Sequence, residues 1–351
     1  MKGGDNSPDG AALGPPDRDR AVSGQRYARE TLQPRRESPL LTDEFGPAGP
    51  IIVLTAIGLE YEAVRAHLVD PRRVIHEGTW FEAGEVTGAG HQVVLAEVGP
   101  GNRATAAFAE RARARFAPRA IIFVGVAGSL KPDVRLGDVV VADKIYAYDG
   151  SKQASDAEFA RPAAWEPSHG LLQAAKHSLR GSAWTERVRA GAFQPGRLPE
   201  VHVKPVAAGE TVLNSMNSPL RERLTSVFND AVAVEMESAG LATAAVLGKV
   251  DVLTIRGISD CADGAKASAD ARGSQQIAAA HAAAAAMAVI AALPGDDGIS
   301  GTTGQESGPA DDAPALAQGP RQINRADRKG VVNAVQNGNQ TINYGPQVTD
   351  R

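Results

Sequence analysis

The sequence predicts an α/β protein in which helices flank a single mostly parallel or mixed central sheet, with disordered N- and C-terminal extensions. Segments with the apolar spacing of strands alternate with segments that have the spacing of helices, and this alternation favours a helix-covered sheet. The strand segments are nearly continuous apolar runs, such as AIIFVGVAG at 120–128. Runs of this kind are typical of strands that are buried on both faces.

The predicted elements follow one another between residues 51 and 293. Strands are expected at 51–57, 91–98, 120–128, 138–146, 231–236 and 250–259, with a further apolar segment at 205–213. Helices are expected at 59–68, 104–116, 218–228, 237–247 and 277–293. The last of these is mostly alanine and contains His281, so we expect it to pack on the sheet rather than to cross a membrane. In such a sheet the ligand lies beyond the carboxyl ends of the strands.

Composition divides the chain into four segments. Residues 1–48 are rich in Gly, Pro, Asp and Arg and have no apolar periodicity, so a disordered extension is predicted. Residues 49–293 hold nearly all of the regular apolar pattern and form the predicted folded domain. A Gly-, Pro-, Asp- and Ser-rich linker is predicted at 294–327, and a short distinct motif at 328–348.

Charge and cysteine content narrow the classes of function. The net charge of −4 gives no general attraction to nucleic acid or to an anionic membrane, so we expect neither as a partner. The only cysteine, Cys261, excludes an intrachain disulfide and favours a cytoplasmic location. We expect it to be a buried, unreactive thiol. The seven histidines show no paired spacing of the kind that metal sites use.

Acidic residues stand at three places where predicted strands end or helices begin: Glu60, the pair Glu235 and Glu237, and Asp260. In AVAVEMESAG (231–240), two carboxylates follow an apolar run with no neighbouring Lys or Arg. Residues two apart on a strand share a face, so this pair can reach one cleft if the strand continues through it. As alternatives, Glu237 favours a helix N-terminus and Asp260 caps a turn. Their convergence at one edge indicates a site built from carboxylates.

The turn VGPGNRA (98–104) lies between a predicted strand and a predicted helix. Its Gly-x-Gly-x-x-Ala spacing resembles a dinucleotide fingerprint, but the next strand ends in Val124-Gly125-Val126 without the acid that would bind a ribose. The glycines therefore permit a tight turn, or their N–H groups bind a polar ligand beside the helix. Arg103 either faces a phosphate or lies on the exposed side of the helix.

Several motifs, taken together and in order, make residues 50–293 resemble the purine nucleoside phosphorylase superfamily. They are TAIGLEYEAV, the glycine turn at 99–101, GVAGSL with LGDVVVAD, AAGETVLNS, VEMESAG and TIRGISD. Within that superfamily the chain is most similar to the methylthioadenosine/S-adenosylhomocysteine nucleosidases. The resemblance implies hydrolysis of the N-glycosidic bond of a purine nucleoside or nucleotide, without a cofactor or metal, by a homodimer or higher oligomer.

The resemblance also implies catalytic roles for three residues. Asp260 matches the general acid that protonates the leaving purine, and Ser259 supports it. Glu60 matches the residue that positions and activates water. This division of labour between carboxyl groups is also the one that glycoside hydrolysis uses.

Substrate-binding positions follow from the same motifs. Glu237 matches the carboxylate that accepts hydrogen bonds from the ribose hydroxyls, Met236 packs under the sugar, and Glu235 has a lesser, supporting role. Val212 and Leu213 match positions that line the purine pocket. Ala127 and Gly128 match the loop near the ribose and the nucleophile.

Other functions stay open at this stage. A phosphorylase would use phosphate in place of water, but a Gly-Asp-Pro-x-Arg type sequence is absent near residue 58 and Glu60 would repel phosphate. A nucleoside sensor without catalysis would not need the acid. The long polar segment after Asp149 departs from the compact nucleosidases, in which this region helps to cover the 5′ side of the substrate, so the 5′ substituent stays open.

The C-terminal stretch GVVNAVQNGNQTINYG (330–345) is uncharged and combines β-branched residues, Asn, Gln and Gly. This composition favours in-register stacked strands with Asn and Gln ladders. It resembles the amyloid-like signalling motifs of bacterial immune effectors, and domains similar to 50–293 occur fused to signalling modules in bacterial defence proteins. The resemblance implies a protein partner with a matching motif; the alternative is a disordered tail.

Overall fold

The computed structural model describes residues 45, 49–189, 192 and 197–295. The predicted motif at 328–348 and nearly all of both extensions lie outside these residues. In chain order the elements are β1 (Ile51–Thr55), α1 (Gly58–Arg65), β2 (Leu68–His76), β3 (Thr79–Val86), β4 (Gln92–Glu97), α2 (Asn102–Phe116), β5 (Ala120–Ser129), β6 (Val139–Ala147), β7 (Ser151–Gln153), β8 (Glu158–Ala160), β9 (Ala163–Trp165), α3 (His169–Ser178), the 3-10 helix η2 (Ala183–Arg187), β10 (Val201–Ala208), α4 (Pro219–Val227), β11 (Ala233–Glu235), α5 (Ser238–Gly248), β12 (Asp251–Asp260), α6 (Lys266–Ala271) and α7 (Ser274–Ala291).

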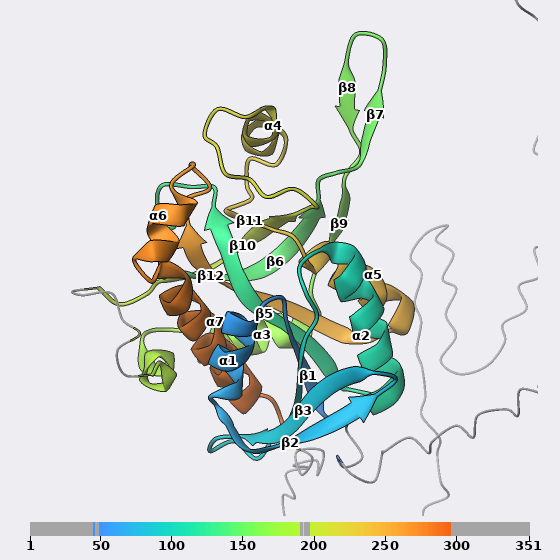
Figure 1. Ribbon diagram of the computed structural model, residues 1–351, viewed down its shortest axis with the longest axis vertical. Helices are drawn as coiled ribbons and strands as arrows, with labels where there is room; N and C mark the ends of the chain where they lie inside the picture. Colours follow the sequence, from blue (N-terminus) through green and yellow to red (C-terminus); the bar gives the residue numbers. More distant parts are fainter. Residues whose placement is uncertain (1–44, 46–48, 190–191, 193–196, 296–351) are drawn as a thin grey trace, which may run out of the picture. The chain divides into compact units, whose positions relative to one another are not determined.

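One mixed sheet organises these elements, in the order β11-β10-β6-β12-β5-β1-β4-β3-β2 (Figure 1). Pairing is parallel from β4 through β1 and β5 to β12, and again among β6, β10 and β11. It is antiparallel where β12 meets β6. Because β11 also pairs with β5, the strands β5, β12, β6, β10 and β11 close into a ring. The predicted α/β class and its central sheet are confirmed, in the mixed form.

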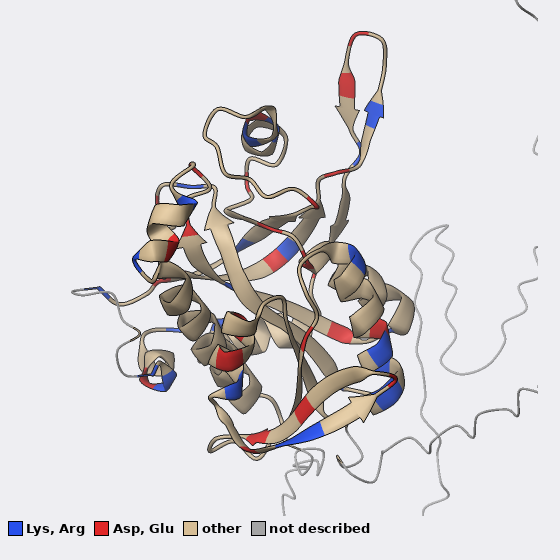
Figure 2. Cartoon of the chain, viewed as in Figure 1, with Lys and Arg blue, Asp and Glu red and all other residues tan. Residues whose placement is uncertain are grey.

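Both faces of the central strands are buried, which explains their continuous apolar sequences. In β1, Ile51 and Val53 pack with α1, α3 and α7 on one face. The alternate residues Ile52 and Leu54 pack with α2 and α5 on the other face. Figure 1 shows these two helical layers with the sheet between them, and Figure 2 shows charges of both signs spread over the helices and the outer strands.

Helix α7 is the alanine-rich segment that the sequence predicted to pack on the sheet. It is long and apolar enough to cross a membrane, and among the described helices only α7 passes that test of length and composition. Most of it is buried against other elements, and the ring nitrogens of His281 lie 2.6 and 2.8 Å from the carbonyl oxygens of Gly137 and Ala192, which accept hydrogen bonds from the protonated ring nitrogen. The packing that was predicted for this segment is therefore confirmed.

Several elements were not predicted. The edge hairpin β2–β3 has an irregular burial pattern, and β2 carries Pro71 and several charges. The polar segment after Asp149 holds the short β7–β8 ribbon, β9, α3 and η2. Neither segment has the continuous apolar run that identifies the inner strands, because each faces solvent on at least one side.

Candidate active site

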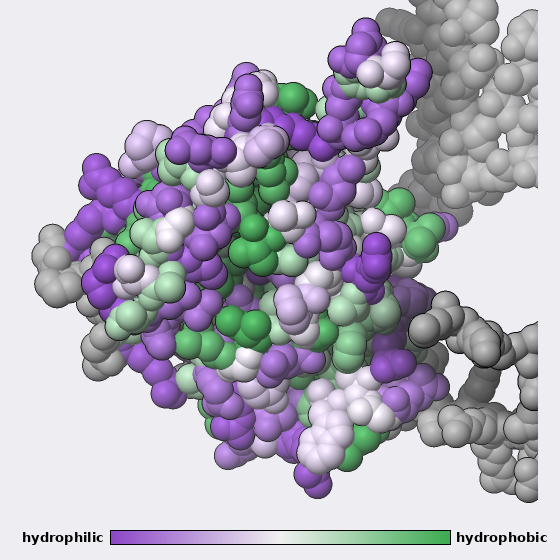
Figure 3. Space-filling model, turned by 45° about the horizontal axis from the view of Figure 1, so that its top comes forward, coloured by the Kyte–Doolittle hydropathy of each residue, from purple (hydrophilic) through white to green (hydrophobic). Residues whose placement is uncertain are grey.

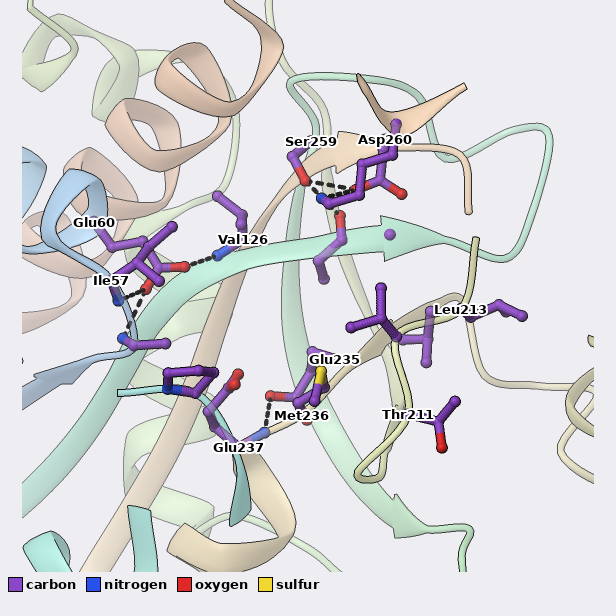
Figure 4. A pocket seen from close by; sticks show the side chains of 17 residues that line it. Ile57, Glu60, Val126, Thr211, Leu213, Glu235, Met236, Glu237, Ser259 and Asp260 are labelled. Carbon is purple, nitrogen blue, oxygen red and sulfur yellow. Dashed lines mark hydrogen bonds and ion pairs between the residues drawn. The ribbon is translucent and has the colours of Figure 1, made fainter. Parts of the chain in front are cut away.

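A cavity of about 150 Å³ lies where β1, β5, β11 and β12 end or pass one another (Figure 4). Side chains reach it from α1, from the loop after β10 and from α6 as well. On the face of the molecule shown in Figure 3, hydrophobic residues gather near the middle and hydrophilic residues surround them. The residues that line the cavity are Ala56, Ile57, Glu60, Pro100, Val126, Ala127, Gly128, Thr211, Val212, Leu213, Val234, Glu235, Met236, Glu237, Ser259, Asp260 and Lys266.

Glu60 is held rigidly although it lies in the first turn of α1. Its Oε2 accepts hydrogen bonds from the backbone N–H groups of Ala56 at 2.7 Å and Ile57 at 3.2 Å, and its Oε1 accepts one from Val126 at 2.8 Å. Burial raises the pKa of Glu60, against the opposing effect of Arg256 and of the backbone hydrogen bonds. A carboxylate with a raised pKa is a stronger base, as a residue that activates water requires.

The glycine of GVAGS at position 125 is needed for this arrangement. A Cβ at Gly125 would lie 2.7 Å from Oε1 of Glu60, and it would be even closer to Nη1 of Arg256. Both distances are too short for any side chain at this position. The sequence thus uses glycine where two charged side chains approach the same strand.

Glu235 is neutralised by a residue far away in the sequence. Arg256, fully buried on β12, forms an ion pair with Glu235 and a second one with Glu237, for which the Nη2 to Oε2 distance is 3.1 Å. Its guanidinium also lies over the ring of Phe123, 4.4 Å from the centroid. Burial raises the pKa of Glu235, whereas Arg256 acts in the opposite direction.

Glu237 lies at the start of α5, in the N-cap position, but its carboxylate does not cap the helix. The N–H of Gly101 donates to Oε1 of Glu237 at 3.2 Å, and Arg256 binds Oε2. The backbone N–H of Glu237 in turn donates to Glu235 at 3.0 Å. The glycine turn at 99–101 therefore fixes a carboxylate that lines the cavity.

Asp260 ends β12 and accepts three hydrogen bonds. Ser259 Oγ and Lys266 Nζ donate to Oδ2 at 3.0 and 2.8 Å, and the N–H of Ala262 donates to Oδ1 at 2.9 Å. Gly128 lets this carboxylate approach β5, since a Cβ there would lie 2.9 Å from Oδ1. Lys266 is the only cationic residue among the described residues that line the cavity.

Most of the predicted site residues lie together. Glu60, Ala127, Gly128, Val212, Leu213, Met236, Glu237, Ser259 and Asp260 all line the one cavity. Arg103 does not: it is exposed on α2 and absent from the lining, which agrees with the solvent-facing alternative. The prediction of a buried Cys261 is wrong, because the thiol follows the end of β12 and is exposed.

Two residues of the site were missed from the sequence, Arg256 and Lys266. An arginine inside the apolar strand VDVLTIRGIS was the available signal, since a fully buried arginine needs an acidic partner. Nothing comparable marked Lys266, which reaches Asp260 only through the turn into α6. Among the residues that the structure describes, no three His, Cys, Asp or Glu side chains are grouped to hold a metal ion.

A sequence model described as the phosphorylase superfamily matches residues 50–293. The chain belongs to the phosphorylase superfamily. Known nucleosidases resemble this chain at moderate sequence identity. A 5′-methylthioadenosine/S-adenosylhomocysteine nucleosidase of Mycobacterium bovis is 30% identical over 226 residues, covering 60% of this chain and 85% of the relative. A nucleosidase of the same name from Maridesulfovibrio salexigens is 29% identical over 184 residues, covering 51% and 72%.

Solved structures share the superfamily fold. The nucleosidase of Colwellia psychrerythraea in complex with adenine has a TM-score of 0.60 at 23% identity, covering 70% of this chain and 96% of that one. The futalosine hydrolase of Helicobacter pylori has a TM-score of 0.59 at 22% identity, covering 70% and 99%. At these identities the likeness establishes the fold of the chain.

Proposed function

We propose that this chain hydrolyses the N-glycosidic bond of a purine nucleoside or nucleotide and releases the base. The observation that carries the proposal is the meeting of Glu60, Glu237 and Asp260 in one cavity. These three carboxylates come from separate elements, and each is oriented by its own hydrogen-bond donors. The nucleosidase relatives support the reaction class, because their names describe cleavage of purine nucleosides.

In the proposed reaction, Asp260 donates a proton to a ring nitrogen of the purine as the bond to the anomeric carbon breaks. The electron pair of that bond stays with the base, and the sugar becomes cation-like. Glu60 accepts a hydrogen bond from the attacking water and takes its proton. Nη1 of Arg256, without a hydrogen-bond partner among the described residues, lies beside Gly125 close to Glu60 and stabilises the ionised form of this carboxylate from behind the cavity.

The other residues bind the substrate. Glu237 accepts hydrogen bonds from the ribose hydroxyls and Met236 packs under the sugar. The purine packs on aliphatic side chains, since the cavity lining contains Val212 and Leu213 but no aromatic residue among those described. Because aliphatic walls give little of the geometric preference that an aromatic ring provides, discrimination between bases depends on polar contacts at Asp260.

The substitution Asp260→Asn tests the acid. The amide keeps the shape of the site but has no acidic proton to give, so base release is expected to fall by about 10²–10⁴-fold with little change in nucleoside binding. Release of adenine from adenosine, methylthioadenosine, AMP, ATP and NAD should be measured with residues 1–351. Turnover by the variant close to that of the unaltered chain, on whichever substrate is cleaved, would remove the assignment.

Phosphate distinguishes hydrolysis from the phosphorylase alternative. We expect the same rate with and without phosphate and a free ribosyl product, because the buried carboxylate of Glu60 repels an anionic nucleophile. A rate proportional to added phosphate, with accumulation of ribose 1-phosphate, would assign a phosphorylase. Nucleoside binding with no product under any condition would favour the sensor.

We further propose that the activity serves a cytoplasmic signalling or defence system through the C-terminal stretch. Its uncharged, Asn- and Gln-rich sequence offers little to a globular core and suits stacking between chains. A peptide of residues 328–348 is expected to form fibrils that bind thioflavin, whereas Gln340→Pro and Ile342→Asp peptides stay soluble. If the unaltered peptide stays monomeric for days at high concentration, the stretch is an ordinary tail.

A further inference from the structure

Among the residues that the structure describes, Lys266 is the only cation that forms an ion pair with Asp260, the proposed acid. It is the first residue of α6, its side chain is 30% exposed, and its Nζ lies 2.8 Å from Oδ2 of Asp260. The residues just before Lys266 form a hydrogen-bonded turn, in which the carboxylate of Asp263 accepts a hydrogen bond from the N–H of Ala265 at 2.9 Å. The ammonium group of Lys266 therefore lies beside the cavity, and a hydrogen-bonded turn fixes the backbone that carries it.

Every donor around Asp260 stabilises the ionised carboxylate rather than the acid. Ser259 and Lys266 donate to one oxygen and the N–H of Ala262 donates to the other. The two oxygens offer about four lone-pair positions, so these three donors leave one position on Oδ1 for the acidic proton. The contact with an ammonium group is also the strongest of the three when the carboxyl group is charged. Lys266 therefore interacts more strongly with the form of Asp260 that remains after proton transfer.

We propose that Lys266 is a positioning residue that promotes proton transfer from Asp260 to the leaving base. This inference rests on the proposed function. As the O–H bond of Asp260 breaks and an N–H bond forms on the purine, the negative charge that appears on Asp260 is stabilised by the ammonium group. Lys266 keeps all of its protons, and solvent returns a proton to Asp260 after the base has left. An interaction that strengthens along the reaction raises kcat rather than substrate affinity.

Kinetics of Lys266→Met test this inference, with Lys266→Arg as the conservative variant. Lys176→Met is the matched control, because Lys176 is exposed on α3 and does not line the cavity. We expect Lys266→Met to lower kcat for a purine nucleoside by about 10–100-fold, part of the range for general acid catalysis, and to change KM by less than about threefold. Lys266→Arg should recover most of kcat. The control should match the unaltered chain.

Combining Lys266→Met with Asp260→Asn distinguishes the possible roles. If Lys266 acts through Asp260, the lysine substitution changes the residual rate of Asp260→Asn by less than about threefold. An equal loss in both backgrounds, a rise in KM alone, or a loss that Lys266→Arg does not recover and that accompanies a lower melting temperature would each overturn the inference. An unchanged kcat in Lys266→Met would also overturn it while leaving the proposed function intact. Near-normal turnover by Asp260→Asn would instead remove the proposed function itself.

Discussion

The substitution Arg256→Met should destabilise the protein strongly, because it removes the only group that forms ion pairs with Glu235 and Glu237 among the described residues. The side chain of Glu235 is only 1% exposed, so solvent cannot replace the guanidinium as its partner. Breaking a buried pair by removing one partner typically costs about 3–5 kcal/mol. For a domain of this size, about 2–4 °C is lost per kcal/mol, so the melting temperature should fall by about 6–20 °C.

The destabilisation should depend on pH. Burial already raises the pKa of Glu235, and without Arg256 the opposing effect is lost. A carboxyl group whose pKa is higher in the folded state destabilises the protein as pH rises from its unfolded value, about 4.3, through the folded one. The deficit of Arg256→Met should therefore be smaller at about pH 5 than at about pH 8. Adding Glu235→Gln should recover about 1–3 kcal/mol, the usual range for coupled neighbours.

Urea and thermal unfolding followed by circular dichroism measure these differences. Arg113→Met is the matched control. Its partner Glu110 is one helical turn away at 2.7 Å, and both side chains are at least one third exposed, so the substitution should cost at most about 1 kcal/mol. The reasoning is refuted if Arg256→Met lies within about 1 kcal/mol of the unaltered chain. A deficit that is equal at both pH values would show that Glu235 is not the charge left unpaired.

Three other measurements test the close packing at Gly125 and the ionisation of Glu60 and Asp138. Gly125→Ala should lower kcat by at least about 10-fold and cost about 1–3 kcal/mol, because its Cβ would collide with Glu60 and Arg256; normal kinetics would contradict the close approach. Burial raises the pKa of Glu60, so the acid limb of the pH profile of kcat/KM should give an apparent pKa above about 4.3, the ordinary value for glutamate. An apparent pKa at that ordinary value would count against Glu60 as the base. Burial alone would raise the pKa of Asp138, but hydrogen bonds from His202, Glu200, Arg135 and Arg197 lower it. Asp138→Asn should therefore cost about 1–3 kcal/mol near neutral pH, with a difference that shrinks as pH falls through the lowered pKa; a deficit independent of pH would exclude this linkage.

The inner strands could be predicted from the sequence because strands that are buried on both faces have continuous apolar sequences. AIIFVGVAG and VDVLTIRGIS became β5 and β12 at nearly the expected bounds. The hairpin β2–β3 could not, because an edge hairpin with one exposed side tolerates Pro71 and charged residues that break the alternation. The direction of β11 was also hidden: it runs antiparallel to β5, and a strand's direction depends on pairing between distant segments.

The carboxylates of the site could be predicted from the sequence, but the pairing of Glu235 with Arg256 could not. Glu60, Glu237 and Asp260 belong to local motifs at element ends, which one sequence displays directly. The partner of Glu235 lies 21 residues further along, on a strand that does not pair with β11. The ring of strands brings them together, so the contact exists only in three dimensions. In the sequence, Glu235 therefore looked like an acid without a counter-charge.

The charge balance of the cavity fits the proposed reaction. Glu60, Glu235 and Glu237 surround a single guanidinium, which lies behind Glu235 and Glu237 and is not part of the cavity lining. The three carboxylates thus line the cavity while Arg256 stays outside its lining. Burial makes the charge on Glu60 unfavourable in the empty site, as its raised pKa indicates. A sugar that becomes positive offsets that unfavourable charge only as the glycosidic bond breaks, so the site stabilises the transition state more than the neutral nucleoside.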